Sequence, residues 1–156
     1  MRKATLFLQY LLPALWLGEI LAISFMEAPL KFYAPNVTMA LGAGIGKLVF
    51  FALNKVEIAF LFLFSATLVV EPAIKRVYYL TGAAAAILLL QSWVLLPLLN
   101  ERVLLLQHGE VPPASNLHTL YIITDIMKCI VLLLLCWQIL VSKGSLKLSN
   151  QESKSI

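Results

Sequence analysis

The chain has 156 residues, of which 61% are hydrophobic and only 13% are charged. A water-soluble domain is about 45–50% apolar and about 25% charged, so this composition excludes an ordinary soluble domain and predicts a membrane protein. The net charge of +4 comes from scattered lysines and arginines that form no basic stripe, which argues against nucleic acid as a partner.

Four apolar segments are each long enough to cross a hydrocarbon core, which takes about 20 residues. The predicted spans are 5–26, 48–70, 78–99 and 119–141. The first follows Arg2 and Lys3 like a signal peptide, but its apolar run is too long, contains Glu19 and precedes no A-x-A cleavage pattern. The sequence therefore predicts an all-α, integral-membrane four-helix bundle over residues 1–141, followed by a short polar cytoplasmic tail, 142–156, without regular structure.

The positions of lysine and arginine predict the orientation, because these residues favour the cytoplasmic side. The side that holds both termini and the second loop carries Arg2, Lys3, Lys75, Arg76, Lys143, Lys147 and Lys154. The other side carries Lys31, Lys47 and Arg102. Both termini are therefore expected in the cytoplasm.

Prolines mark the loops on the predicted outer side. Pro29 is expected to end or kink the first helix, because proline lacks a backbone N–H. Pro35 and Asn36 indicate a fresh helix start near Val37, so the second helix should have an extended N-terminal end within the first outer loop. Further along, Pro112 and Pro113 precede Ser115 and Asn116, either of which is expected to cap the fourth helix.

Glycines at the entry to the second span admit two interpretations. The run from Gly42 to Lys47 superficially resembles a phosphate-binding loop, but Leu48 follows the lysine and the glycine spacing is wrong. We favour the other interpretation, in which Gly42 and Gly46 form a small-residue stripe that lets two helices pack closely.

Polar residues inside the spans agree in depth. Glu19, Glu57, Gln91 and Lys128 each lie roughly 13 or 14 residues from the cytoplasmic end of their helix, which is about 20 Å at 1.5 Å per residue. Asn54 and Asp125 lie about one turn further out. Four helices that placed polar groups independently would not be expected to agree, so the sequence predicts one shared buried polar layer that also includes Lys55.

Ionisable groups in spans usually face the bundle interior and pair with one another. We expect Lys128 to pair with Asp125 or Glu57, and Glu19 to pair with Lys55 unless that lysine extends outward along its stem. Because the spans contain three acids and two lysines, one acid is left over. It is protonated, paired with Lys31, or neutralised by a bound proton or cation.

Two further residues lie on the stripe of the fourth helix that carries Asp125 and Lys128. His118 and Tyr121 are predicted at the outer mouth of the bundle. Cys129 and Cys136 are seven residues apart on the same helix, too far for a disulfide, and are interpreted as small apolar fillers. No metal-ligand spacing and no Ser/His/Asp set is present, so we expect no catalytic residues, no metal and no cofactor.

Several short motifs resemble a family. They are Trp16-x-Gly18, Ala28-Pro29-x-x-Phe32, the set Gly42, Gly46 and Phe50, and Leu120-Tyr121-x3-Asp125-x2-Lys128. Together they resemble small four-helix bacterial membrane proteins of unknown function, a group loosely similar to the CopD copper-resistance domain and the HemJ-type membrane proteins. The resemblance implies the four-helix architecture and the bacterial inner membrane. Those relatives hold haem or metal through helix-borne histidines, whereas the first span here has none.

Three functions compete at this point. The first is a non-enzymatic multi-pass membrane protein whose polar layer binds or conducts a small solute, ion or proton. The second is a scaffold or interaction protein with a purely structural polar layer, and the third is a membrane protein that handles metal or haem. The lipid bilayer is an expected partner in each case, and a second copy or another membrane protein is a further candidate.

Overall fold

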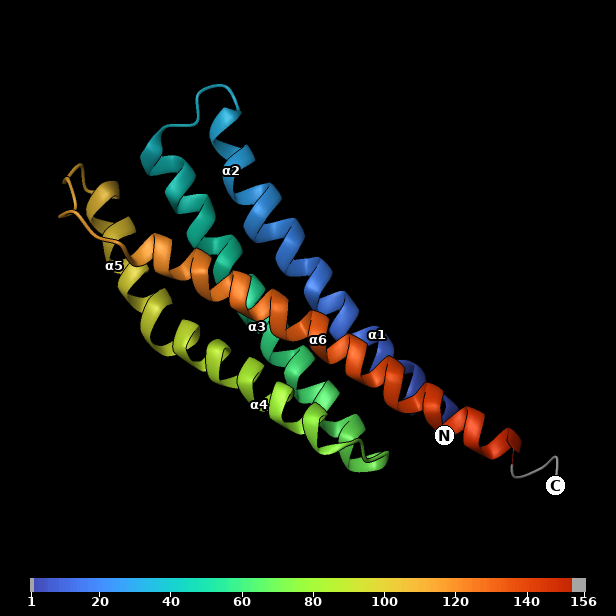
Figure 1. Ribbon diagram of the computed structural model, residues 1–156. Helices are drawn as coiled ribbons and strands as arrows, with labels where there is room; N and C mark the ends of the chain where they lie inside the picture. Colours follow the sequence, from blue (N-terminus) through green and yellow to red (C-terminus); the bar gives the residue numbers. More distant parts are fainter. Residues whose placement is uncertain (1, 153–156) are drawn as a thin grey trace.

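The computed structural model describes residues 2–152, with side chains described for residues 2–142. Over this part of the chain it consists of four long helices and contains no strand (Figure 1). All four are long and apolar enough to cross a membrane: Arg2–Tyr33, Met39–Val70, Lys75–Gln107 and Leu117–Ser142. The predicted all-α fold with four potential spans is confirmed for these residues, and each span is longer than predicted.

Two of the long helices are composite. The first is formed by α1 (Arg2–Ile20), a π-helical segment (Leu21–Glu27), α2 (Ala28–Leu30) and a 3₁₀ turn (Lys31–Tyr33). The third is formed by α4 (Lys75–Leu90), a π-helical segment (Gln91–Leu95) and α5 (Leu96–Gln107). The second and fourth are the single helices α3 (Met39–Val70) and α6 (Leu117–Glu152).

A proline follows both π-helical segments, whereas α1 stays regular around Pro13. Pro29 and Pro97 each follow one of them closely. A proline within a helix lacks an N–H, and its ring collides with the carbonyl group four residues earlier, so a wider π turn before it relieves the collision. Of the two outcomes predicted at Pro29, an end of the first helix is wrong, because the helix continues to Tyr33. The structure has a distortion instead, in the π-helical segment just before the proline.

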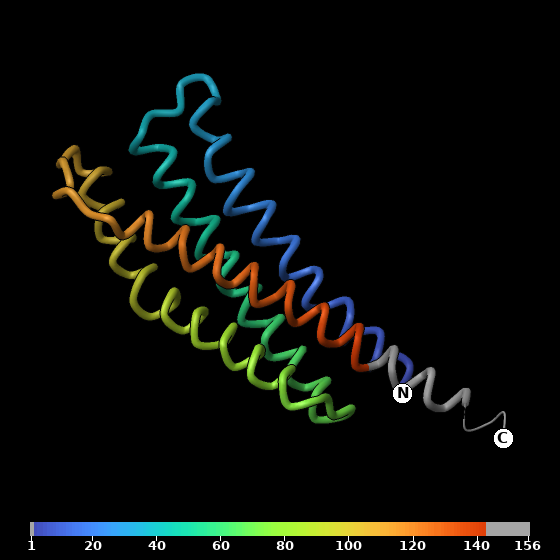
Figure 2. The backbone as a smooth tube through the Cα atoms, in the orientation of Figure 1, coloured from blue at the N-terminus to red at the C-terminus, as the bar shows by residue number. Residues whose placement is uncertain are grey.

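The loops 34–38 and 108–116 lie at one end of the bundle, and the turn 71–74 lies at the other end with the start of α1 (Figure 2). We call these the loop end and the N-terminal end. α1 packs against α3 and α6, α6 also packs against α4, and α3 also packs against α5. The helices therefore form an up-down bundle, in which every long helix contributes to one interior.

Side-chain caps fix where the second and fourth helices begin. Thr38 Oγ1 accepts a hydrogen bond from Leu41 N at 3.2 Å, so α3 begins at Met39, close to the predicted start near Val37. Asn36 has a left-handed φ of 64°, which asparagine tolerates better than most residues. Ser115 Oγ accepts from Leu117 N at 3.1 Å where α6 begins, as one of the two predicted caps.

The fourth helix ends later than the sequence predicts. α6 continues to Glu152, so the predicted absence of regular structure is wrong for residues 142–152. No proline interrupts this stretch, and its lysine, leucine, glutamine and glutamate residues favour helix. Residues 153–156 of the predicted tail lie outside the described residues.

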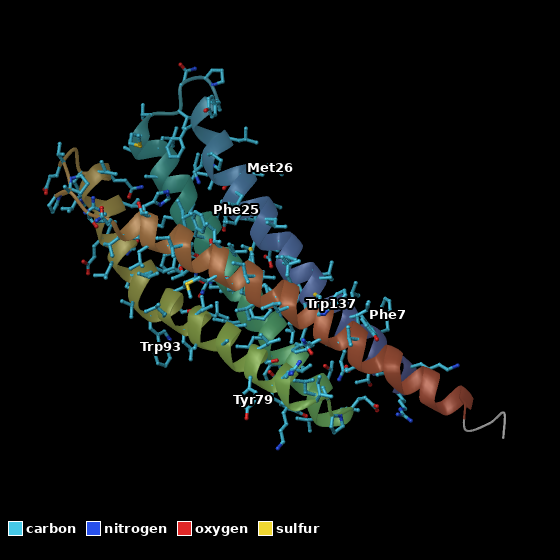
Figure 3. The ribbon with its side chains drawn as sticks, viewed as in Figure 1. Phe7, Phe25, Met26, Tyr79, Trp93 and Trp137 are labelled. Carbon is cyan, nitrogen blue, oxygen red and sulfur yellow. The ribbon has the colours of Figure 1, made fainter. Side chains whose placement is uncertain are left out.

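Large apolar side chains cover the outside of the bundle. Trp93 is 78% exposed and Tyr79 is 75% exposed, and both are labelled in Figure 3 with other exposed apolar residues of the bundle surface: Phe7, Met26 and Trp137. Soluble proteins rarely expose a contiguous apolar surface of this kind. Its presence on all four helices fits contact with lipid.

The N-terminal half of the interior is apolar. Its core is formed by Leu12, Trp16, Ile20, Phe64, Leu68, Val77, Ala84, Leu88, Cys129, Leu132, Leu135 and Ile139. At its end, Gln9 Nε2 donates to the carbonyl oxygens of Thr67 and Glu71, at 3.2 and 2.6 Å. Glu71 is the C-cap residue of α3, and its N–H donates to the same Thr67 carbonyl oxygen at 2.9 Å. Gln9 therefore joins α1 to the C-terminal end of α3 and closes this end of the core.

Candidate binding site in the bundle interior

Lys128 is a fully buried lysine in the middle of α6. Its Nζ lies 2.5 Å from Glu57 Oε1 and 3.3 Å from Asp125 Oδ1, and it also donates a hydrogen bond to Gln91 Oε1. An ammonium group has three N–H donors and no acceptor. The three oxygens, supplied by α3, α6 and the third helix, therefore match its hydrogen-bonding capacity.

Gln91 and Trp16 complete this network. Gln91 Nε2 donates to Asp125 Oδ1 at 2.8 Å and to Thr124 Oγ1 at 2.9 Å. Trp16 Nε1 donates to Glu57 Oε1 at 2.9 Å. We call the six residues that are joined in this way the polar layer: Trp16, Glu57, Gln91, Thr124, Asp125 and Lys128. Every long helix contributes at least one of them.

The charges of the polar layer do not balance. It holds two carboxyl groups, Glu57 and Asp125, and one ammonium group, and all three side chains are at most 1% exposed. Glu57 Oε2 and Asp125 Oδ2 are buried without a hydrogen-bond partner. A buried and uncompensated charge is strongly unfavourable, so the layer requires one further proton or cation to become neutral.

Three residues predicted for the layer lie outside this network. Glu19 is only partly buried, and its Oε2 has no hydrogen-bond partner. Asn54 is buried and forms a separate pair, in which its Nδ2 donates to Ser92 Oγ at 2.7 Å. Lys55 is exposed on α3, so its predicted place in a buried layer is wrong. Neighbouring residues on a helix point about 100° apart, and Asn54 takes the inward direction.

The predicted ion pairs of Lys128 and Glu19 differ in outcome. Lys128 pairs with both Glu57 and Asp125, whereas the sequence offered them as alternatives. Among the ion pairs between described side chains, none joins Glu19 to Lys55. Lys31 pairs with Glu27, one turn before it on the first helix, at 3.4 Å.

A cavity of about 680 Å³ lies at the loop end of the bundle. Its walls come from the first helix, α3, α5 and α6, and it reaches Asp125 of the polar layer. Tyr121, one turn before Asp125, also lines it, and its buried hydroxyl group has no hydrogen-bond partner. The Tyr121 ring packs edge-on against Phe50, with the two ring centroids 5.2 Å apart. We call the part lined by Asp125 and Tyr121 the cavity floor.

The two residues predicted at an outer mouth thus occupy different places. His118 is exposed and lines the cavity near the start of α6, whereas Tyr121 is buried at the floor. On the opposite side of the polar layer lies the apolar core of the N-terminal half. The polar layer is therefore reached through the cavity from the loop end, and apolar side chains close it from the N-terminal end.

Gly42 and Gly46 are both buried, but they serve a different contact from the predicted one. A Cβ atom added to Gly42 would overlap the Phe32 ring, and one added to Gly46 would lie 2.8 Å from Lys31 Nζ. The nearest atoms are thus side chains from the 3₁₀ turn, not the backbone of a second helix. The two glycines make room for Phe32 and Lys31 beside α3.

Cys129 and Cys136 are free thiols, as the helical spacing predicts. Among the described residues, no group of three or more His, Cys, Asp or Glu side chains is arranged to hold a metal ion. Comparison of the chain with protein-family models, curated proteins and solved structures gives no match.

Proposed function

We propose that this chain is a non-enzymatic multi-pass membrane protein whose polar layer binds a small cationic species, with a proton as the favoured ligand. The observation that carries the proposal is the position of Asp125. This side chain belongs to a network with one carboxyl group in excess, and it also lines a cavity with an unpartnered oxygen. Ionisable groups inside membrane bundles commonly mark ion pathways and proton relays.

A proton fits this site better than a metal ion does. One proton on Asp125 or Glu57 would balance the charge of Lys128 and would give an unpartnered carboxyl oxygen a hydrogen. Calcium takes six to eight oxygen ligands, and the described residues around Asp125 offer no comparable set. Tyr121 is also at the floor, where its hydroxyl group can exchange hydrogen bonds with a protonated carboxyl group.

A hydrophobic carbodiimide tests whether Asp125 carries an exchangeable proton. In this reaction the carboxyl proton moves to a reagent nitrogen and the carboxylate oxygen bonds to the central carbon. The acyl group then migrates to nitrogen, so the stable adduct adds the mass of one reagent molecule. We expect one adduct per chain at Asp125, measured by peptide mass spectrometry.

The matched variants are Asp125→Asn, which should abolish this adduct, and Glu101→Gln, which should leave it unchanged. Glu101 is a suitable control because it is an exposed acid on α5, outside the network. Labelling of Glu57 in place of Asp125, or no labelling at any pH, would contradict the proposal.

A scaffold with a purely structural polar layer is the competing function, and it is favoured by the saturated hydrogen bonding of Lys128. Polar contacts between membrane helices are worth about 0.6 kcal/mol on average, enough for such a role. A purely structural layer would also hold one balancing proton, but it predicts that a reagent in the cavity does not react with it. The same carbodiimide experiment therefore separates the two functions.

We further propose the bacterial inner membrane as the location, with both termini in the cytoplasm and the cavity facing outward. The distribution of lysine and arginine supports this orientation. The variants Glu110→Cys and Lys75→Cys test it, because these exposed residues lie at opposite ends of the bundle. In intact cells lacking Cys129 and Cys136, a membrane-impermeant maleimide should label the first variant only, and labelling of the second alone would reverse the orientation.

A further inference from the structure

Three basic side chains line the cavity above its floor. They are Lys31, Lys47 and Arg102, from the first helix, α3 and α5. Asp125 at the floor is the only acidic residue among the described cavity-lining residues. Outside the lining, Glu27 pairs with Lys31 at 3.4 Å, and Arg102 donates to the Pro113 carbonyl group at 2.7 Å. Above the cavity floor, the three basic side chains therefore outnumber the acidic side chain of Glu27, which pairs with Lys31.

Lys31 is held inside the cavity and does not extend into solvent. Its side chain is only 9% exposed, and Nζ lies 5.7 and 5.6 Å from the ring centroids of Phe32 and Phe50. A lysine ammonium group is attracted to aromatic faces within about 6 Å. Gly46 provides the space for this position, since an added Cβ would lie 2.8 Å from Nζ.

The remaining wall of the cavity is mostly apolar. Phe25 of the first helix and Ile122 of α6 both line it and are both exposed on the lipid-covered surface. Two residues of the cavity wall are thus also exposed on the outer surface of the bundle. The cavity volume of about 680 Å³ lies within the range of small-molecule sites. The apolar lining includes Phe25, Phe51, Leu96, Leu99, Val103 and Ile122.

We propose that the cavity binds a single-chain amphiphile with an anionic head group, namely a long-chain carboxylate taken up from the bilayer. The head group lies between Lys31, Lys47 and Arg102, and the chain lies along the apolar wall. A cationic amphiphile would be repelled by the same three groups, and a small free anion would leave the apolar wall unused. The proposal goes beyond proton binding at Asp125, because it depends on different residues.

The test uses a sixteen-carbon carboxylate with a photoreactive diazirine in its chain, added to the full-length protein in phosphatidylcholine nanodiscs. After irradiation, adducts are located by peptide mass spectrometry and quantified. We expect adducts on the apolar wall, and at least about tenfold fewer with the alcohol of equal chain length, because hydrogen bonds to charged groups are lost.

Matched variants separate the head-group site from general lipid contact. Lys31→Met should lower the apparent affinity for the carboxylate about tenfold, whereas Lys55→Met, which changes an exposed lysine, should leave it unchanged. Lys31→Arg should retain binding. Gly46→Ala should weaken binding, because the new methyl group displaces the Lys31 ammonium. If Lys31→Met fails to fold, Arg102→Met provides the same comparison.

Three results would overturn the proposal. They are equal labelling by the alcohol and the carboxylate, unchanged affinity in both Lys31→Met and Arg102→Met, and displacement of the probe by excess acetate, which would indicate a site for small anions. Asp125→Asn distinguishes this proposal from proton binding. It should abolish carbodiimide labelling and leave carboxylate binding unchanged or stronger.

Discussion

Replacing Lys128 by methionine is expected to destabilise the protein more than any other change of a polar residue considered above. Methionine retains most of the side-chain volume but leaves Glu57 and Asp125 together, fully buried and without their shared ammonium partner. Breaking a buried ion pair by removing one partner costs about 3–5 kcal/mol in soluble proteins. Membrane helix contacts are individually weaker, so we expect the lower end of this range.

The measurement is the apparent Tm in detergent, with Lys55→Met as the matched control because Lys55 is exposed on α3. The double variant Lys128→Met with Glu57→Gln should recover much of the loss, and a double-mutant cycle then gives the coupling between the two groups. An unchanged Tm in Lys128→Met alone would show that this lysine is not paired in the interior.

The second large expected effect is a difference in how fast a water-soluble reagent reaches the cavity at the loop end and the apolar core at the N-terminal end. In a chain with Cys129→Ala and Cys136→Ala, we expect an Ala43→Cys variant to react with a charged thiosulfonate at least about two orders of magnitude faster than an Ala84→Cys variant. Ala43 lines the cavity, whereas Ala84 is completely buried in the apolar core. A thiol in apolar surroundings neither ionises readily nor meets a charged reagent.

The rates are measured in nanodiscs, with Glu110→Cys as the control for full exposure. The anionic reagent should also react faster than the cationic one at position 43, because Lys31, Lys47 and Arg102 line the same cavity. Equal rates at positions 43 and 84 would show that both halves admit solvent, and the polar layer would then be accessible from both ends.

Much of the architecture follows from the sequence, because span length and hydrophobicity are local properties. The common depth of Glu57, Gln91 and Lys128 also predicts that these residues meet, whereas Glu19 shares that depth and lies outside the network. The π turns before Pro29 and Pro97 were not predictable from proline alone, since the same residue ends many helices. Whether a helix ends at a proline or continues through a π turn depends on its packing against neighbouring helices, which a single sequence does not display.

The members of the polar layer that sequence reasoning missed are Trp16 and Thr124. Trp16 reads as an apolar residue, although its indole N–H requires a partner when it is buried, and Glu57 provides that partner. Its position one turn before Glu19 was an available signal. For Lys55, the alternative in which its side chain extends outward agrees with the structure, because its neighbour Asn54 takes the inward direction of α3.

The position of the cavity also has an electrical consequence. A cavity filled with solvent carries the potential of its own side down to its floor, so a membrane voltage would fall mainly across the apolar half between Trp16 and Ile139. Moving one elementary charge through 100 mV takes about 2.3 kcal/mol. A proton that enters from the loop end and stops at Asp125 would cross little of this field. A proton that continued to the N-terminal end would cross most of it, so only that second step would depend strongly on voltage.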